Sequence, residues 1–171
     1  MKLNTTHVPV QYYFKVIDSP VGSLRLIANE HGLAGVLWEN ERLGGGDFMP
    51  QKEELDHPVL LKAEAQLKEY FLGKRTQFDL ALYFRGTPFQ KAVWDYLVHI
   101  PFGETRSYKD VAQALGRPKA VRAVGAANGR NPIAIIAGCH RVIGANGSLT
   151  GFAGGLAAKS YLLSLESKLS N

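Results

Sequence analysis

Cys139 is the residue in this sequence best suited to covalent chemistry, and it is the only cysteine among 171 residues. A single thiol cannot form an internal disulfide, so Cys139 is either a small apolar side chain of the core or a working nucleophile. His140 follows it directly, and the apolar run 133–137 precedes it. This pattern predicts a buried or half-buried place for the pair. Because adjacent side chains point apart in helices and strands, we expect no direct bond between thiol and imidazole.

Glu166 is a second candidate, in a helix predicted over about 155–167. Leu162 lies four residues before it and Leu169 three residues after it, so the carboxylate shares an apolar stripe. A carboxylate buried on such a stripe needs a partner. From these residues alone, Glu166 is either a paired buried group or part of a frayed, solvated helix end.

Basic residues are concentrated in the segment 106–141. It holds seven basic residues and one acidic residue, a net charge of +6, whereas the whole chain carries +5. Most basic runs are solvated faces, but one confined to a helix-turn-helix-like segment predicts a phosphate-binding surface. The seven are Arg106, Lys109, Arg117, Lys119, Arg122, Arg130 and Arg141.

Small residues fill the second helix of this segment, predicted over about 119–128. They suit either tight packing inside the protein or close approach to a nucleic-acid groove, and the basic charge favours the groove. Arg122 is then the side chain that projects from this helix. The small residues are Ala120, Ala123, Gly125, Ala126 and Ala127.

The remaining elements predict an α+β fold with a boundary near residue 86. Residues 1–85 should form a small domain of antiparallel sheet and helix, and residues 86–171 a mainly helical domain with a helix-turn-helix. The first domain is expected to contain strands at 12–18, 23–28, 33–38 and 79–84, a mobile loop at 39–55 around three glycines, and a helix at 57–72. The second should contain helices at 87–99, 107–115, 119–128 and 155–167, and a hairpin-type turn at 144–147.

Composition excludes several classes of protein. With 46% hydrophobic residues the chain can build a core, yet no run approaches the roughly 18 apolar residues of a membrane span. The first ten residues lack a continuous apolar stretch, so we expect no secretory signal. One cysteine rules out a disulfide scaffold and a cysteine-rich zinc site. A cytoplasmic location is expected, because a reactive thiol must stay reduced.

Several spaced motifs surround the cysteine: Gly-Thr-Pro-Phe-Gln at 86–90, Ile-Pro-Phe-Gly at 100–103, Ser-Tyr at 107–108, Arg-Ala-Val-Gly at 122–125, Asn-Pro at 131–132, Cys-His-Arg-Val at 139–142 and Gly-Gly at 154–155. Together they resemble the O6-alkylguanine-DNA alkyltransferases, the methylated-DNA–protein-cysteine methyltransferases. The resemblance runs from about 86 to 166. Upstream it is weaker, limited to Ser-Pro-Val-Gly at 19–22 and the general layout.

The resemblance implies direct repair: the alkyl group of O6-alkylguanine, and of O4-alkylthymine, passes from DNA to Cys139. A thioether is not readily cleaved, so each molecule would act once. His140 would reach Cys139 through a water molecule, with Glu166 against the imidazole. Tyr108 would donate a proton to the purine, and Asn131 would be the hinge between recognition helix and active-site segment.

The resemblance also implies the partner. This is double-stranded DNA carrying an alkylated guanine, bound in the minor groove without sequence specificity by a monomer. Arg122 would fill the base stack from which the nucleotide is flipped, and no cofactor or metal is expected. The residues expected at the DNA are Ser107, Tyr108, Lys119, Arg122, Ala123, Ala126, Ala127, Arg130 and Arg141.

Three positions depart from the family pattern. Gly138 stands where the family usually has proline, so we expect a looser loop before the cysteine. Phe152 replaces a common tyrosine and Ala153 an occasional serine, which removes a hydroxyl that could contact the base and leaves the preferred alkyl group open.

Two other classes of function compete with the alkyltransferase. A helix-turn-helix regulator would prefer one DNA sequence and would not need its cysteine. A cysteine hydrolase would turn over repeatedly and would need an oxyanion hole.

Overall fold

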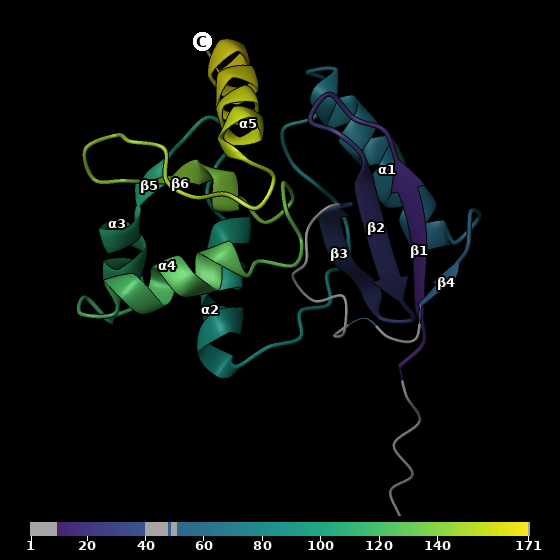
Figure 1. The fold of residues 1–171 in the computed structure, drawn as a ribbon, viewed down its shortest axis with the longest axis horizontal. Coiled ribbons are helices and arrows are strands. Elements are labelled where there is room, and N and C mark those ends of the chain that lie inside the picture. The colour runs from purple at the N-terminus through teal and green to yellow at the C-terminus, as the bar shows by residue number, and fades with distance from the viewer. Residues whose placement is uncertain (1–9, 40–47, 49–50, 171) are drawn as a thin grey trace, which may run out of the picture.

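The computed structural model describes residues 10–39, 48 and 51–170. Figure 1 shows a sheet with one helix behind it on one side, a cluster of helices on the other, and α5 rising between them. In the sheet half, the elements are β1 Tyr12–Ile17, β2 Leu24–Asn29, β3 Gly32–Trp38, β4 Gln51–Glu53 and α1 Pro58–Phe71. In the helical half, they are α2 Pro88–Val98, β5 Arg106–Ser107, α3 Tyr108–Ala114, α4 Val121–Gly129, a 3-10 turn η1 Cys139–Arg141, β6 Val142–Ile143 and α5 Leu156–Leu169.

The N-terminal sheet has the strand order β3-β2-β1-β4. β1, β2 and β3 form the predicted antiparallel meander. β4 pairs in parallel with β1, which the prediction of a loop over 39–55 missed. The rest of that loop, including the three glycines, lies outside the described residues apart from residues 39, 48, 54 and 55. β4 has only three residues and lies at the edge of the sheet, so its hydrophobic pattern is too short to predict a strand from the sequence.

β3 is the edge strand of the sheet, and two segments from far along the chain pair with its outer side. Leu33 exchanges backbone hydrogen bonds with residues 81 and 83, and Val36 does so with residues 132 and 134. The strand predicted at 79–84 is therefore wrong in extent, because only a single bridge at Leu82 forms. The second contact ties the segment before the cysteine directly to the N-terminal sheet.

Side-chain caps begin α2 and α3 close to where the sequence predicts. Thr87 with Gln90, and Ser107 with Asp110, form capping boxes at the starts of α2 and α3. α3 ends before Gly116, which has the left-handed φ of +71° that glycine adopts at no steric cost. The chain then turns into α4, giving the predicted helix-turn-helix. Trp94 of α2 donates from its indole nitrogen to the Ala127 carbonyl at 2.8 Å and so anchors α4.

One hydrophobic core joins the two halves of the chain. Buried residues of β1, β2, β3 and α1 pack with the apolar run 133–136 and with Ala158 and Leu162 of α5. A second core lies among α2, α3 and α4 and includes Cys139. The predicted α+β class is therefore confirmed, and the buried connector at 131–142 is where the two cores meet. Within the described residues, no helix is long and apolar enough to cross a membrane.

Candidate active site

Cys139 is the first residue of the η1 turn, and its side chain is only 5% exposed. The connector before it is fixed from within by Asn131. Its amide oxygen accepts from the Ile133 backbone N–H at 3.0 Å, and its amide nitrogen donates to the Ala137 carbonyl at 3.0 Å. Between these points Ile135 has a φ of +72°, a conformation that costs a β-branched residue about 1–3 kcal/mol. Asn131 therefore holds a tightly folded segment, and its expected role as a hinge stays a prediction.

Gly138 contacts α2 through its backbone. Its backbone N–H donates to the Leu97 carbonyl of α2 at 3.2 Å, a bond that a proline could not make. A side-chain carbon at this position would lie 2.9 Å from Arg141 Cδ. This hydrogen bond restrains the backbone at Gly138, and the expectation of a looser loop before the cysteine stays a prediction.

His140 and Glu166 meet as the resemblance implies. The imidazole Nε2 lies 2.6 Å from Glu166 Oε2, and both side chains are almost fully buried. A carboxylate only accepts, so Nε2 carries the proton and Nδ1 is left as an acceptor. Nδ1 is buried and has no hydrogen-bond partner among the described residues. The imidazole is therefore oriented by Glu166 and has a free basic nitrogen.

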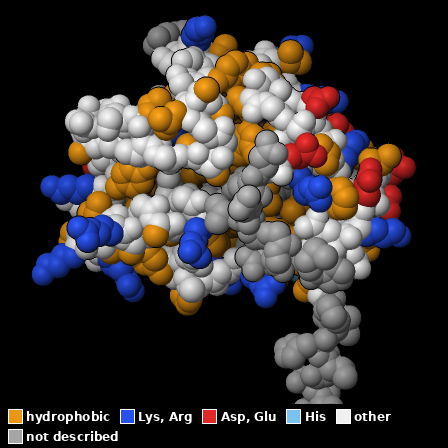
Figure 2. All heavy atoms as spheres, viewed as in Figure 1, with side chains coloured by type: hydrophobic (Ala, Val, Ile, Leu, Met, Phe, Trp, Pro, Cys, Tyr) orange, Lys and Arg blue, Asp and Glu red, His pale blue; other side chains and the backbone are white. Residues whose placement is uncertain are grey.

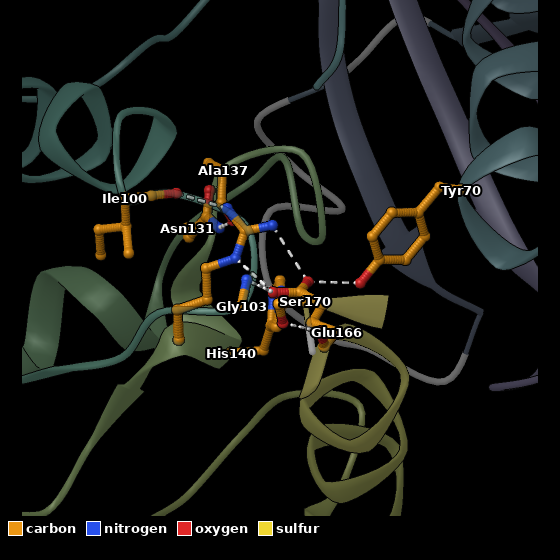
Figure 3. A network of polar contacts seen from close by, with 9 residues as sticks. Tyr70, Ile100, Gly103, Asn131, Ala137, His140, Glu166 and Ser170 are labelled. Carbon is orange, nitrogen blue, oxygen red and sulfur yellow. Dashed lines mark hydrogen bonds and ion pairs between the residues drawn. The ribbon is translucent and has the colours of Figure 1, made fainter. Parts of the chain in front are cut away.

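Both carboxylate oxygens of Glu166 accept further hydrogen bonds (Figure 3). Arg141 reaches Oε1 through Nε at 2.7 Å and Oε2 through Nη2 at 3.0 Å. The Gly103 N–H points at Oε1 at 3.3 Å, and the Tyr70 hydroxyl donates to Oε2 at 2.6 Å. Tyr70 comes from α1, and neither its spacing nor its neighbours in the sequence signal a role at this site.

Burial and charge act in opposite directions on these groups. Burial works to raise the pKa of Glu166, but the hydrogen bonds from His140 and Arg141 and the charge of Arg141 outweigh it and hold that pKa well below its usual range. Burial lowers the pKa of His140 despite the pull of the carboxylate. The resting pair is therefore a neutral imidazole beside an ionised carboxylate.

Lys159 of α5 is a further buried cation that the sequence analysis missed. Its side chain is fully buried, and its Nζ donates to the Val142 carbonyl at 2.7 Å. Burial lowers the pKa of this ammonium, and the charge of the Cys139 thiolate opposes that effect. Among the described residues, no carboxylate lies within ion-pair distance of Lys159. A lysine three residues before the buried Leu162 on the same helix was the available signal.

A narrow pocket of about 10 Å³, room for roughly one water molecule, adjoins Cys139. Asn128 at the end of α4, Phe152 in the loop before α5, and Trp38 of β3 are in its wall. The Trp38 and Phe152 rings meet edge to face at 5.3 Å. Tyr108, at the first position of α3, is half-buried, and its hydroxyl is hydrogen-bonded to the Thr150 hydroxyl of the same loop. Both Tyr108 and the loop thus border the approach to the cysteine.

The outer face of α4 carries exposed small and basic residues. Arg122, Ala123 and Ala126 are exposed there, Lys119 is exposed in the preceding turn, and Arg130 is exposed just after the helix ends. Ser107 is half-buried as the cap of α3. In Figure 2, Lys and Arg side chains project over the half that carries α3 and α4, while the acidic side chains in view gather over the sheet half.

Two residues expected at the DNA do not lie on this face. Ala127 is buried in the core beneath α4, with only 3% of its surface exposed. Arg141 is 5% exposed, and its guanidinium is committed to Glu166 and to the Ile100 carbonyl. The sequence showed small residues and a positive charge correctly, but it did not show which way these side chains point. Both are removed from the expected DNA-contacting set.

Comparison with known proteins bears directly on this arrangement. Two family models match the chain: "6-O-methylguanine DNA methyltransferase, ribonuclease-like domain" over residues 12–84 and "6-O-methylguanine DNA methyltransferase, DNA binding domain" over residues 88–168. A methylated-DNA–protein-cysteine methyltransferase of Methanosarcina barkeri is 47% identical over 162 residues, covering 90% of this chain and 96% of the relative. The constitutive enzyme of that name from Bacillus subtilis is 44% identical over 156 residues, covering 90% and 94%.

Solved structures agree with these relatives. The Mycobacterium tuberculosis OGT in complex with DNA is 45% identical, with a TM-score of 0.82 over 94% of each chain. The crystal structure of the O6-methylguanine methyltransferase of the same organism is 44% identical, with a TM-score of 0.84 over 94% of this chain and 95% of that chain. The chain therefore belongs to the 6-O-methylguanine DNA methyltransferase family, and the resemblance found in the sequence is confirmed.

Proposed function

We propose that this protein repairs DNA by transferring the alkyl group of O6-alkylguanine, and of O4-alkylthymine, in duplex DNA to the Cys139 sulfur. The observation that carries the proposal is the only cysteine of the chain, buried beside a small pocket and followed by a histidine that a buried carboxylate orients. The relatives named methylated-DNA–protein-cysteine methyltransferases support the same assignment. The reducing cytoplasm is the proposed location, since the thiol must not be oxidised.

The first step is loss of the thiol proton. His140 Nδ1 is the basic nitrogen available for it, and a bridging water is the proposed path from Cys139, because neighbouring side chains point apart. Glu166 then faces an imidazolium and stabilises its charge. The Glu166 pKa is held well below its usual range, so the proton stays on His140 and does not pass to the carboxylate.

Lys159 contributes a second source of thiolate stability. The buried ionised groups of this region in the described chain are the cations Arg141 and Lys159 and the anion Glu166. The thiol proton passes to His140, so the net buried charge stays at one positive unit, but the transfer creates an anionic sulfur near the Lys159 ammonium. This environment favours a reactive thiolate.

In the transfer step the sulfur attacks the alkyl carbon, a sulfur–carbon bond forms, and the bond from that carbon to guanine O6 breaks. The departing base is left with an extra electron pair and takes a proton from the Tyr108 hydroxyl, which solvent later restores. Tyr108 bonds to Thr150 in this structure, so the loop that contains Thr150 and Phe152 has to shift as the base enters. The product thioether ends the reaction after one turnover.

The proposed partner is alkylated duplex DNA in its minor groove, bound by a monomer without sequence preference. Chemistry on a base inside a duplex requires that the nucleotide be flipped out, which costs a few kcal/mol. Arg122 stands on the exposed face of α4 among alanines and is the side chain proposed to fill the gap. Flanking cations such as Lys119 and Arg130 suit phosphate contacts.

Mass spectrometry of the protein after incubation with a duplex that contains O6-methylguanine tests this function. We expect one added methyl group per molecule, located on Cys139, and no reaction after the protein is consumed. Cys139→Ala should still bind the duplex but should leave the methyl group on the DNA. Repeated turnover, or demethylation by the Cys139→Ala variant, would rule the proposal out, and steady hydrolysis of a chromogenic ester would favour a cysteine hydrolase instead.

A further inference from the structure

Tyr70 connects the N-terminal sheet half of the molecule to the active site. It lies on α1, 96 residues before Glu166 in the chain, and its hydroxyl donates to Glu166 Oε2 at 2.6 Å. Its ring is fully buried. The rings of Phe71, Phe78 and Phe102 surround it with centroids at 5.3, 5.6 and 6.1 Å. In Figure 3 the ring extends from the sheet side of the molecule towards the carboxylate. The Tyr70 ring is therefore held in place by packing, with Phe71 and Phe78 from its own half of the chain and Phe102 from the other.

We propose that Tyr70 is a positioning residue for alkyl transfer: its hydroxyl holds Glu166 Oε2 against the His140 imidazole. This inference rests on the proposed function and assigns part of that function to the N-terminal half of the chain. Glu166 Oε2 accepts from three groups, namely Tyr70, His140 and the Arg141 Nη2. Tyr70 is the only one of the three that comes from outside the η1 turn.

The Arg141 guanidinium competes with the His140 imidazole for the Glu166 carboxylate, which is why a hydroxyl at Tyr70 is needed. Arginine holds both carboxylate oxygens and is the strongest partner that Glu166 has, because its hydrogen bonds are bidentate and charge-assisted. Without the Tyr70 hydroxyl, His140 and Arg141 are the donors left to Oε2 among the described residues, and the carboxylate settles onto the guanidinium at the expense of the imidazole. A weaker contact from Glu166 then supports the imidazolium less well.

The groups that face this carboxylate come from several elements. His140 and Arg141 belong to η1, Gly103 offers its backbone N–H, and Lys159 on α5 acts on the same imidazole. Tyr161 on α5 adds a weak effect on Tyr70. Burial raises the pKa of the Tyr70 hydroxyl, and the charge of Glu166 raises it further, so Tyr70 remains a donor at every pH at which the protein works. Any pH dependence that Tyr70 confers therefore arises through His140 and Cys139.

The consequence is a change in the pH at which the thiolate forms. An imidazolium that is less stabilised takes the thiol proton less readily, so the thiolate appears only at higher pH. For Tyr70→Phe we expect reaction with free O6-benzylguanine to be about tenfold slower at pH 7, and the pH profile to move up by about one unit, as loss of a hydrogen bond to a charged group implies. At high pH, where the thiol ionises without help, the two proteins should react at similar rates.

The experiment measures single-turnover rates with O6-benzylguanine as a function of pH for wild type, Tyr70→Phe and Tyr13→Phe. Phenylalanine keeps the ring and its packing, and Tyr13 is a half-buried tyrosine of β1, remote from the carboxylate network, that serves as the control. Rates are expressed per reactive Cys139, counted by mass spectrometry, so that a misfolded fraction does not lower them. The same substitution is repeated in a Glu166→Gln background, where Tyr70→Phe should have no further effect on the profile.

Two results would overturn the inference. One is a Tyr70→Phe profile that coincides with that of wild type. The other is a loss of rate of equal size at every pH, or one that persists in the Glu166→Gln background, because either would mean that Tyr70 acts on the fold and not through the carboxylate. Failure of the wild type itself to accept an alkyl group would instead refute the proposed function, so the two failures are distinguishable.

Discussion

At the scale of single residues, Glu166 joins parts of the chain that are distant in sequence. It accepts hydrogen bonds from Tyr70, Gly103, His140 and Arg141, and only 1% of its surface is exposed. Its lowered pKa means that it stays ionised, so it orients and stabilises without taking a proton. A carboxylate with this many donors also stabilises the fold, so its loss should lower the free energy of unfolding.

The acid stability of the protein should report this directly. The folded-state pKa of His140 and that of Glu166 are both lowered, so at acid pH the unfolded chain binds more protons. Stability is therefore full above the unfolded histidine pKa of about 6.5, falls as the pH drops through it, and falls again below the unfolded glutamate pKa of about 4.3. Urea unfolding of wild type across this range should show both declines.

Glu166→Gln should remove the second decline in stability, which is the one expected below the unfolded glutamate pKa of about 4.3. At neutral pH it should also lower the free energy of unfolding by about 3–5 kcal/mol, because Arg141 is left as a buried charge without its partner. Glu69→Gln is the matched control: Glu69 pairs with Arg75 on the surface, and its loss should change stability by less than about 1 kcal/mol. Equal effects of the two substitutions would contradict the role assigned to Glu166.

At the scale of elements, α4 has one face buried in the core and an opposite face exposed to solvent. Val124, Ala127 and Asn128 are buried, while Arg122, Ala123 and Ala126 are exposed. The indole of Trp94 fixes the buried side to α2. Small residues on the exposed side let the helix backbone approach a groove closely. Arg122, near the start of α4, then has the length needed to reach between bases.

Arg122 should matter for duplex DNA and not for the free base. Arg122→Ala should slow repair of O6-methylguanine in duplex DNA by about tenfold or more, because the cost of the flipped nucleotide is no longer offset. Reaction with free O6-benzylguanine, which needs no flipping, should be unchanged. Arg122→Lys keeps the charge but loses the planar guanidinium, so it should rescue the duplex reaction only in part.

Three outcomes distinguish the roles of this arginine. Full duplex activity in Arg122→Lys, with a weaker dependence of binding on salt in Arg122→Ala, would make Arg122 an ordinary phosphate contact. Equal loss with duplex and free base would make it structural. Only a loss confined to the duplex and partly restored by lysine agrees with insertion into the base stack.

At the scale of the whole molecule, the two halves share a core. The segment 132–134 pairs with the edge of β3, and residues 133–136 pack with the buried faces of the sheet and α1. Tyr70 adds a polar contact across the same interface. The segment that leads to Cys139 thus depends on the N-terminal half for its position. The N-terminal half therefore supports the structure of the half that contains Cys139.

A shared core predicts that both halves unfold together. The chain has two tryptophans, Trp38 in β3 and Trp94 in α2, so Trp38→Phe and Trp94→Phe each leave a fluorescent probe in one half. We expect the fluorescence transition of each variant to coincide with the circular-dichroism transition of the same variant in urea, as a two-state protein requires. A separate, earlier transition in either half would show that the shared core does not couple them.

Features that depend on near neighbours in the chain could be predicted from the sequence. Helix starts at Thr87 and Ser107 follow from capping boxes whose partners are three residues apart. The candidate nucleophile, its neighbouring histidine and the helical carboxylate could be proposed from the sequence, because the first two share a local motif and the third lies on an apolar stripe that predicts a partner. The α+β class followed from the order of such local patterns along the chain.

Which distant residues meet depends on how the chain folds. Tyr70 reaches Glu166 across 96 residues without any signal in its spacing, and Lys159 lies buried near Cys139, for which its spacing from Leu162 was the one local signal. Ala127 and Arg141 turn inward for a related reason: composition predicts a basic, small-residued helix region, whereas burial depends on the surface against which each side chain packs. Such contacts form only when the two cores close together, and no periodicity in a single segment specifies them.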